Sequence, residues 1–582
     1  MCQSDTSSCL KFATIAAVLM GTVLQAQPAA SNEIEYRLNW RPIGTTVVFN
    51  GRAGFSGAPA AGIWFSEDGR GLEVQLASGR TFRSEDFENW SLTAKAGLRA
   101  ASTEARVVDQ SPEAGAMIAA VSTNPYRVYA LGKSLWRSDD NGKHWLNLVS
   151  FGGLRLIGEN VRAIAISPID DERLAVVTDE GVWLSSDSGQ SWTSMNQGLP
   201  NLYLRKLQSA PKGGRGLLAE WQDGQVVEWM PGAKSAWIGR KINAGVRGQV
   251  SWTDSAKQNV RLEVREEERS KVYRSLDGGD HWDEMTSDLP ATRVMGITAD
   301  RASGAIYLAT ERGVYFTLNS LELASNPTSW VRLGGNLPKE ASLDVMLDEG
   351  ANFLYTSIAG DGVFLTYAPH RRRDPSMISA GNLESRVAAP GALMSVVGLK
   401  LNRAQISGRS IPILSATPDE TQVQIPYDAA APSVAIDLNS DSGRSARMDL
   451  EVAETAPVIF TDRDGAPLVL DAESGELLDP EKPLRPGMRI QILLTGLGRV
   501  DPAWPAGVAA PTANAPKVVA PVRVWMDGKT LDVLKAELAG GYVGFYAVET
   551  QLPVILDSAL SSLSVEAGGR LSNSILIRTS SE

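Results

Sequence analysis

The chain has 582 residues, of which 43% are hydrophobic, so it can bury several cores and is long enough for several domains. Its 56 basic and 67 acidic side chains give a net charge of −11. This charge argues against nucleic acid as a partner, because binding to phosphate requires a basic surface.

Residues 1–26 are predicted to be a signal peptide. Lys11 precedes an apolar run, residues 12–24, and Ala26 offers a cleavage site. The run is too short for a good membrane span, so we expect an exported chain, periplasmic or extracellular, with no stable membrane anchor. Cys2 and Cys9 would be lost with the signal, which leaves the mature chain without disulfides, thiolate metal sites or a cysteine nucleophile.

Residues 33–368 are organised by tryptophans that recur at a nearly constant interval. The successive steps are 50, 55, 47, 45, 45 and 48 residues, within or slightly above the range of a four-stranded propeller blade. These steps predict seven blades. The seven tryptophans are Trp40, Trp90, Trp145, Trp192, Trp237, Trp282 and Trp330.

Three of these tryptophans end the same eight-residue pattern, SxDxGxxW. In such a turn, Asp and Ser side chains can accept hydrogen bonds from backbone N–H groups, glycine supplies a positive φ, and we expect the indole to pack over the hairpin. Burying one indole contributes roughly 4–6 kcal/mol as an upper bound. The box residues are Ser138, Asp140, Gly142, Trp145, Ser185, Asp187, Gly189, Trp192, Ser275, Asp277, Gly279 and Trp282.

The two ends of this region predict that the ring closes on itself. Residues 343–367 contain three strand-like runs and no following tryptophan, whereas residues 33–40 form one unpaired run that ends in Trp40. We expect the two pieces to complete one blade, because closure by the N-terminal strand removes an exposed sheet edge.

The SxDxGxxW pattern resembles the Asp-box, or BNR repeat, of sialidases, sortilin-type receptors, xyloglucan-cleaving glucanases and photosystem assembly factors. The resemblance implies a β-propeller in which the boxes lie on the blade periphery, away from any active site. The boxes are therefore expected to be structural, and function has to be argued from other residues.

Past the repeats, residues 369–376 carry three consecutive arginines between two prolines and are predicted to be a solvated linker. Short β-rich runs without the blade interval follow, and they predict two Ig-like β-sandwich modules, residues 377–455 and 456–582. Four motifs within residues 383–577 resemble the C-terminal β-sandwich module of many secreted acidobacterial proteins, whose function is uncharacterised. The predicted fold class is all-β, a seven-bladed β-propeller followed by two sandwiches.

Recognisable catalytic patterns are missing from the sequence. By the resemblance, a sialidase would need an arginine triad, but residues 41–43 read Arg-Pro-Ile, which inverts the Arg-Ile-Pro motif of that family. His144 and His281 fall within boxes and His370 in the linker, so a histidine-based metal site or triad is not expected. We predict no catalytic residues, no cofactor and no metal ion.

The turns that join second to third strands are rich in acidic residues. The simpler interpretation is that an acidic residue followed by glycine favours a tight hairpin. The alternative is a negative funnel that attracts a cation or a basic peptide. The candidate rim comprises Asp179, Glu180, Asp223, Glu266, Glu267, Glu268, Glu311 and Asp361.

Three functions remain open at this stage. The first is an exported, non-enzymatic binding or scaffold protein whose propeller face holds a glycan or protein ligand. The second is a glycoside hydrolase that uses two propeller-face carboxylates, a geometry that no sequence reveals. The third, an assembly factor for an envelope or membrane complex, follows only from the resemblance to the photosystem factors.

Overall fold

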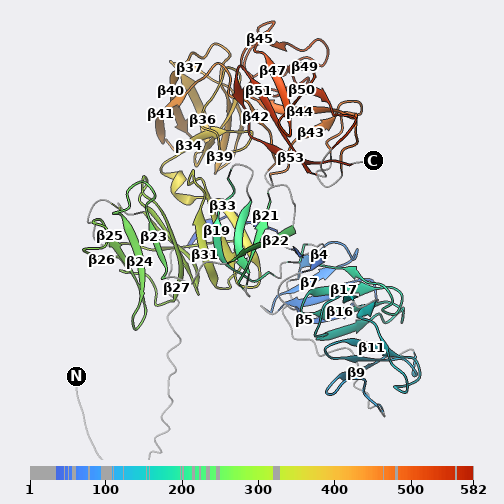
Figure 1. Ribbon diagram of the computed structural model, residues 1–582. Helices are drawn as coiled ribbons and strands as arrows, with labels where there is room; N and C mark the ends of the chain where they lie inside the picture. Colours follow the sequence, from blue (N-terminus) through green and yellow to red (C-terminus); the bar gives the residue numbers. More distant parts are fainter. Residues whose placement is uncertain are drawn as a thin grey trace, which may run out of the picture. The chain divides into compact units, whose positions relative to one another are not determined.

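Strands make up almost all of the regular structure, as Figure 1 shows. The computed structural model describes residues 35–44, 46–49, 52–55, 60–76, 79–93, 108, 110–121, 124–151, 154–155, 157–196, 198–199, 202–212, 216–221, 224–230, 236–243, 249–318, 321, 328–462, 465–478, 483–556 and 560–580. The predicted signal peptide lies outside these residues. Within them the one helix is the short 3₁₀ helix η1 (Pro369–Arg372), which confirms the all-β class. No helix in the described part has the length and apolarity that a membrane span requires.

Seven antiparallel sheets follow one another along the first two thirds of the described chain. Each is a meander of the kind that forms propeller blades. The first four consist of β5 (Ala60–Phe65), β6 (Leu72–Leu76), β7 (Thr81–Ser84) and β8 (Ser91–Leu92); β9 (Met117–Ala120), β10 (Val128–Leu131), β11 (Leu135–Ser138) and β12 (Leu146–Asn147); β15 (Ala163–Ile166), β16 (Leu174–Thr178), β17 (Gly181–Ser185) and β18 (Thr193–Ser194); β19 (Leu204–Ser209), β20 (Leu217–Trp221), β21 (Gln225–Trp229) and β22 (Ala236–Asn243). The last three consist of β23 (Ser251–Thr253), β24 (Arg261–Glu266), β25 (Ser270–Ser275) and β26 (Asp283–Glu284); β27 (Val294–Asp300), β28 (Ala305–Thr310), β29 (Gly313–Leu318) and β30 (Val331–Gly335); β31 (Ser342–Leu347), β32 (Phe353–Ile358) and β33 (Gly362–Tyr367).

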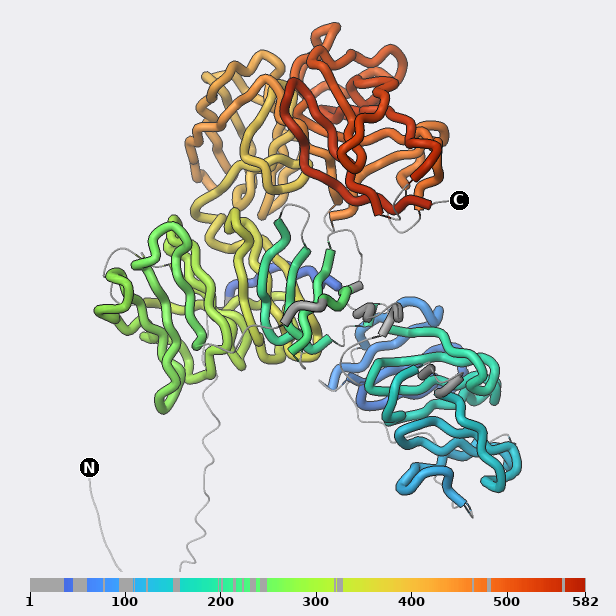
Figure 2. The backbone as a smooth tube through the Cα atoms, viewed as in Figure 1, coloured from blue at the N-terminus to red at the C-terminus, as the bar shows by residue number. Residues whose placement is uncertain are grey.

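The N-terminal strands are distributed over three of these sheets. Strand β1 (Glu35–Leu38) pairs in parallel with β30, β2 (Arg41–Ile43) pairs antiparallel with β33, and β3 (Thr46–Phe49) pairs in parallel with β22. Strand β4 (Arg52–Phe55) extends the last of these sheets. The three-stranded sheet is therefore completed by an N-terminal strand, but the expectation that residues 33–40 supply it is wrong: Glu35–Leu38 pairs with β30, and β2, which follows Trp40, pairs with β33. Figure 2 shows the blue N-terminal tube running beside the green and yellow sheets.

Shared hydrophobic cores join neighbouring sheets, but some of the sheets that share a core are not consecutive along the chain. The sheet β15–β18 shares one core with β9–β12 and another with β5–β8. Further cores join β23–β26 to β27–β30, β27–β30 to β31–β33, and β31–β33 to β19–β22. A ring in chain order would instead place β5–β8 against β9–β12 and β19–β22 against β15–β18. The described cores therefore depart from the predicted ring at these two places.

The tryptophans of the ladder differ in burial. Trp40, Trp237 and Trp330 are at most 7% exposed. The four tryptophans that end a turn, Trp90, Trp145, Trp192 and Trp282, are only partly buried. The expected packing of the indole over each box hairpin is present, because the rings of Trp145, Trp192 and Trp282 lie against the box glycines, but these rings are not fully buried.

The rest of the chain forms two further pairs of sheets, each pair around one core. A small core that includes Leu393 and Phe460 joins the two pairs. The first pair contains β34 (Ser376–Ser379), β35 (Leu393–Val397), β38 (Ile413–Ala416) and β39 (Glu420–Gln424), facing β36 (Leu401–Ile406), β37 (Arg409–Ser410), β40 (Ser433–Ser440) and β41 (Ser445–Glu451). The second contains β42 (Val458–Ile459), β43 (Val469–Asp471), β44 (Arg489–Thr495), β45 (Val500–Asp501), β46 (Lys517–Val518), β49 (Val533–Leu538) and β50 (Tyr546–Gln551), facing β47 (Val522–Met526), β48 (Lys529–Leu531), β51 (Leu560–Ala567), β52 (Arg570–Leu571) and β53 (Ile575–Arg578). A separate hairpin is formed by β13 (Ser150–Phe151) and β14 (Leu154–Arg155).

The segment that was expected to be a solvated linker is buried in its first part and exposed at Arg373 and Asp374. Pro369, His370 and Arg371 are buried in η1. The reason is that their side chains find polar partners on β27, β28 and the loop before β32, which the arginine-rich sequence does not reveal.

Candidate functional site

Each box is a turn closed by its own hydrogen bonds. In the box after β17, the Ser185 hydroxyl donates to Asp187 Oδ1 over 2.8 Å and accepts the Gly189 N–H over 2.8 Å. The same Asp187 oxygen accepts the backbone N–H groups of Gln190 and Ser191. Ser138 and Asp140, and Ser275 and Asp277, repeat this arrangement after β11 and β25.

The box carboxylates are held in their charged form. Backbone and ring N–H groups of His144, followed by the Ser138 hydroxyl, lower the pKa of Asp140, and His281 and Ser275 do the same to the pKa of Asp277. A carboxylate that accepts several hydrogen bonds from its own turn is a poor proton donor. The boxes therefore serve the local structure and leave no acid for chemistry.

A shortened box follows β7 and was missed in the sequence. Ser84 Oγ donates to Asp86, and Asp86 accepts the backbone N–H groups of Glu88 and Asn89. The glycine is absent, and Phe87 takes the positive φ, at 59°. Serine, aspartate and Trp90 at a spacing one residue shorter than in the other boxes would have identified it.

Three residues of the predicted acidic rim are paired with basic side chains. Asp179 pairs with Arg162 at 2.7 Å, Glu267 pairs with Lys271 at 2.9 Å, and Asp361 is 1% exposed and contacts Arg80. The described rim residues lie in or next to turns between second and third strands: Asp179 and Glu180 between β16 and β17, Glu266 at the end of β24, Glu267 and Glu268 between β24 and β25, Glu311 between β28 and β29, and Asp361 between β32 and β33. Asp223 lies outside the described residues.

One rim residue, Glu266, lines a cleft at the junction of the sheets β23–β26 and β27–β30. The cleft has a volume of about 480 Å³, within the range of ligand pockets. The buried Ser270 hydroxyl donates to Glu266 Oε1 over 2.8 Å and accepts the Val294 N–H over 2.9 Å, which fixes the carboxylate. The lining residues are Gln249, Val250, Val264, Glu266, Arg293, Val294 and Met295.

A second unusual carboxyl group, Asp344, joins two inner strands. Its Oδ2 accepts the Leu207 N–H of β19 over 2.8 Å, and its Oδ1 lies where a side chain on Gly296 of β27 would be. Burial raises the pKa of Asp344 to about 7, although two backbone N–H groups and Lys206 oppose the shift. All three inner strands carry a β-bulge here, a feature that adapts a strand to a neighbour.

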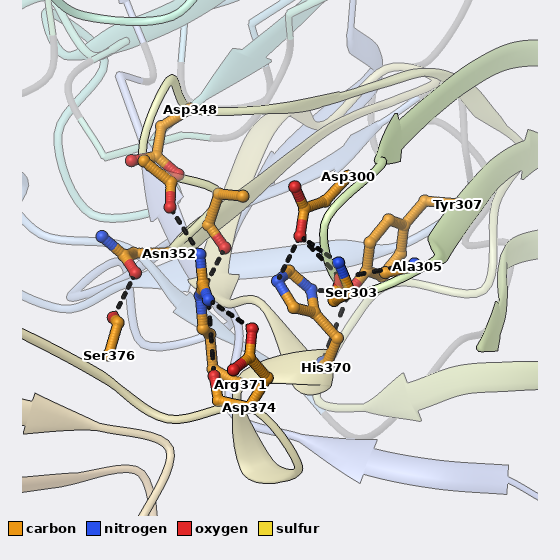
Figure 3. Close-up of polar contacts among 12 residues, drawn as sticks. Asp300, Ser303, Ala305, Tyr307, Asp348, Asn352, His370, Arg371, Asp374 and Ser376 are labelled. Carbon is orange, nitrogen blue, oxygen red and sulfur yellow. Dashed lines mark hydrogen bonds and ion pairs between the residues drawn. The ribbon is translucent and has the colours of Figure 1, made fainter. Parts of the chain in front are cut away.

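The most extensive buried polar cluster surrounds His370 and Arg371 (Figure 3). His370 is 0% exposed, its Nδ1 lies 2.7 Å from the Tyr307 hydroxyl, and its Nε2 lies 3.7 Å from Asp300 Oδ2. Asp300 accepts the N–H and the hydroxyl of Ser303 in the β27–β28 turn. Burial, followed by the charge of Arg371, lowers the pKa of His370, and Asp300 opposes this only in part.

Arg371 fastens the same helix to the loop between β31 and β32. Its guanidinium donates to the carbonyls of Ala351 (3.1 Å) and Gly350 (2.7 Å) and pairs with Asp374 at 3.0 Å. Arg372 extends the other way and donates to Asp419 at 2.9 Å. The tyrosine, histidine and aspartate resemble a catalytic relay in composition, but Tyr307 and His370 are both 0% exposed, so the cluster holds the helix and does not meet a substrate.

Metal ligands are not gathered in the described part of the chain, where no three His, Cys, Asp or Glu side chains converge as a metal site. The prediction that no cofactor is bound stays a prediction.

Comparisons with known proteins do not place the chain in a family. No protein-family model and no curated protein matches it. Solved structures that it resembles include YCF48 bound to D1 peptide (TM-score 0.18, 13% identity, 58% of this chain and 99% of that one) and YCF48 from Cyanidioschyzon merolae (0.18, 13%, 57% and 98%). A third is the GH74 xyloglucanase from Xanthomonas campestris, with a TM-score of 0.15 and 17% identity over 92% of this chain and 93% of that one. TM-scores this far below 0.5 carry no argument about function, so the cleft and the cluster have to be interpreted on their own chemistry.

Proposed function

We propose that the chain is an exported, non-enzymatic binding or scaffold protein in which the seven sheets act as propeller blades and the Glu266–Arg293 cleft receives a ligand. The observation that carries this proposal is the cleft itself, since it combines an apolar lining with a carboxylate that Ser270 holds in place. A few fixed polar groups within an apolar wall are typical of a binding pocket. The C-terminal sheet pairs act as spacer or surface-interaction units.

The lining favours a protein or peptide segment over a glycan. Val250, Val264, Val294 and Met295 suit an aliphatic side chain, and Arg293 and Glu266 supply one charge of each sign. Sugar rings commonly stack on aromatic faces, and none of the residues that line the cleft is aromatic. A peptide with an apolar residue between charged neighbours matches this set best.

The glycoside hydrolase alternative receives less support. Hydrolysis of a glycosidic bond requires two carboxyl groups about 5–10 Å apart, and Glu266 is the one carboxylate among the residues that line the cleft. The assembly-factor alternative is compatible with peptide binding and differs only in the partner.

A binding screen tests the proposal. The full chain would be presented with a peptide library and with a glycan and polysaccharide panel, measuring both retention and release of reducing ends. We expect peptide ligands whose affinity falls at least tenfold in Glu266→Gln and in Arg293→Ala. Arg403→Ala, an exposed arginine on β36, is the matched control and should bind normally. Release of reducing ends, or binding that neither cleft variant weakens, contradicts the proposal.

A further inference from the structure

The hydrogen bonds around His370 define its protonation state. The backbone N–H of His370 donates to the Tyr307 oxygen over 3.4 Å, and we assign the Tyr307 hydroxyl as the donor to Nδ1, which lies 2.7 Å away. The imidazole is then neutral, with its proton on Nε2, which faces Asp300. His370 Nε2 makes no hydrogen bond within the described residues, since Asp300 Oδ2 stands 3.7 Å away.

A second proton on this ring has no suitable place. It would occupy Nδ1 and turn that atom into a donor, so the Tyr307 hydroxyl would lose its acceptor. Tyr307 is 0% exposed, so its O–H would be left buried without a partner, which is costly. Protonation of His370 therefore reverses the hydrogen bond between η1 and β28, with Nδ1 as the donor, and weakens this link at the expense of a stranded phenol proton.

The charges that face the ring do not compensate for this loss. Asp300 on β27 would attract an imidazolium, but Arg371 on the same helix repels it, and Tyr307 is a neutral phenol, since burial raises its pKa well above the ordinary value. Burial raises the pKa of Asp300, yet the Ser303 hydrogen bonds, followed by nearby positive charge, outweigh it, so the net pKa is lowered. At neutral pH, the neutral form of His370 and the charged form of Asp300 thus both favour the arrangement in which η1 is held against β27 and β28. This preference is lost as the pH falls.

The helix that His370 anchors is also the connection to the C-terminal sheets. Arg372 in η1 bonds to Asp419, and close to it Tyr367 donates to Glu420 over 2.6 Å and Ser376 donates to Asn352 over 2.6 Å. These are polar contacts, which a displaced helix would disturb together. The protonation state of His370 is thereby coupled to the attachment of residues 376–580 to the sheets that precede η1.

We propose that Tyr307, His370 and Asp300 form an acid-sensitive lock, which opens when His370 takes up a proton and then releases η1 and the C-terminal sheets from β27, β28 and the β31–β32 loop. The lock is independent of the cleft and goes beyond the proposed binding function. It gives the chain a way to change the position of its C-terminal half in an acidic environment while the sheets themselves stay folded.

Fluorescence energy transfer between two labels tests the lock. In a full chain with Cys2 and Cys9 replaced by serine, Gln258→Cys and Asp441→Cys place one exposed label on each side of η1. We expect the transfer efficiency to fall between pH 7 and pH 4.5, with the open fraction rising by about tenfold or more. His370→Gln accepts the Tyr307 hydroxyl but does not titrate, so it should remove the transition. His144→Gln and His281→Gln, at exposed histidines, should keep it.

Tyr307→Phe provides a second measurement should His370→Gln fail to fold. Without the hydroxyl, protonation no longer strands a buried O–H, so the acid-driven fall in transfer efficiency should become smaller. Constant transfer efficiency in the wild type from pH 7 to pH 4.5, an unchanged transition in His370→Gln, or an undiminished transition in Tyr307→Phe overturns the proposal.

Discussion

The sheets of this chain complete their outer edges in two different ways. Four sheets carry a box turn before the last strand, and in each of these the last strand, β8, β12, β18 or β26, is only two residues long. The three sheets without a box have outer strands β22, β30 and β33 of eight, five and six residues, and each is covered by an N-terminal strand. A long open edge invites pairing with other chains, so an edge is either kept short or covered.

The tryptophans follow the same division. Trp40 lies in the core between β27–β30 and β31–β33, and its indole N–H donates to the Gly334 carbonyl over 3.1 Å. Trp192 in a box is only partly buried, and its indole N–H donates to Leu148 of the adjoining sheet over 3.2 Å. Boxed sheets are therefore completed by local hydrogen bonds, and covered sheets by pairing between residues far apart in the sequence, such as Thr46 with Ala236 and Arg41 with Leu365.

The largest loss of unfolding free energy is expected for a substitution where the N-terminal strands are anchored. Trp40→Ala should cost about 3–5 kcal/mol of unfolding free energy, because it leaves a cavity in a shared core. Trp145→Ala, at a partly buried box indole, should cost only about 1–2 kcal/mol. Urea unfolding gives both values, and hydrogen exchange should show lost protection in β27–β33 for Trp40→Ala alone. Equal costs would contradict the division between covered and boxed sheets.

A smaller change in unfolding free energy should distinguish a carboxyl group of the covered sheets from one of the boxed sheets. Burial raises the pKa of Asp344, between the covered sheets, to about 7, above its unfolded value of 3.8. A raised pKa gives stability that is fully present below pH 3.8 and is lost as the pH rises through 7. Asp344→Asn should therefore be more stable than the wild type by about 1–3 kcal/mol at pH 8, with the advantage disappearing by pH 4. Thermal unfolding measured from pH 4 to pH 8 tests this, and a pH-independent difference would contradict it.

The sequence could predict hydrogen bonds between residues that lie close together along the chain. The spacing of serine, aspartate, glycine and tryptophan in each box specifies hydrogen bonds among residues at most four positions apart, and Ser185, Asp187 and Gly189 make them. That an N-terminal strand completes the sheet β31–β33 could be predicted, because both pieces were incomplete alone, but the strand is β2 and not residues 33–40, since Glu35–Leu38 pairs with β30.

Long-range burial could not be predicted in the same way. Nothing near His370 indicates that Tyr307, 63 positions earlier, supplies its partner, so charged residues between prolines suggested a solvated linker. Asp344 has no sequence signal either, since its raised pKa comes from the packing of β31 on β19 and β27. The acidic turn residues were found as a class, but sequence could not show that Arg162, Lys271 and Arg80 pair with three of them or that Glu266 alone lines a cleft.

The smallest change in unfolding free energy is expected for a box carboxylate. Its pH dependence should have the opposite sign to that of Asp344. Burial raises the pKa of Asp187, but hydrogen bonds from Ser191, Ser185 and Gln190 outweigh it, so the net pKa is lowered. A lowered pKa gives stability that is present above the unfolded value of 3.8 and is lost as the pH falls below it. Asp187→Asn keeps one oxygen acceptor and should cost about 1 kcal/mol at pH 7.

That cost should shrink as the pH falls below 3.8, because the wild type then loses the same charged acceptor. Urea unfolding of Asp187→Asn and the wild type at pH 7 and pH 3 measures the change. Ser194→Ala, two positions beyond the same box, serves as a nearby control whose cost should not vary with pH. A cost for Asp187→Asn that grows on acidification would show that burial, and not the turn, sets the charge of the box. In that case the boxed and covered carboxyl groups would follow the same rule.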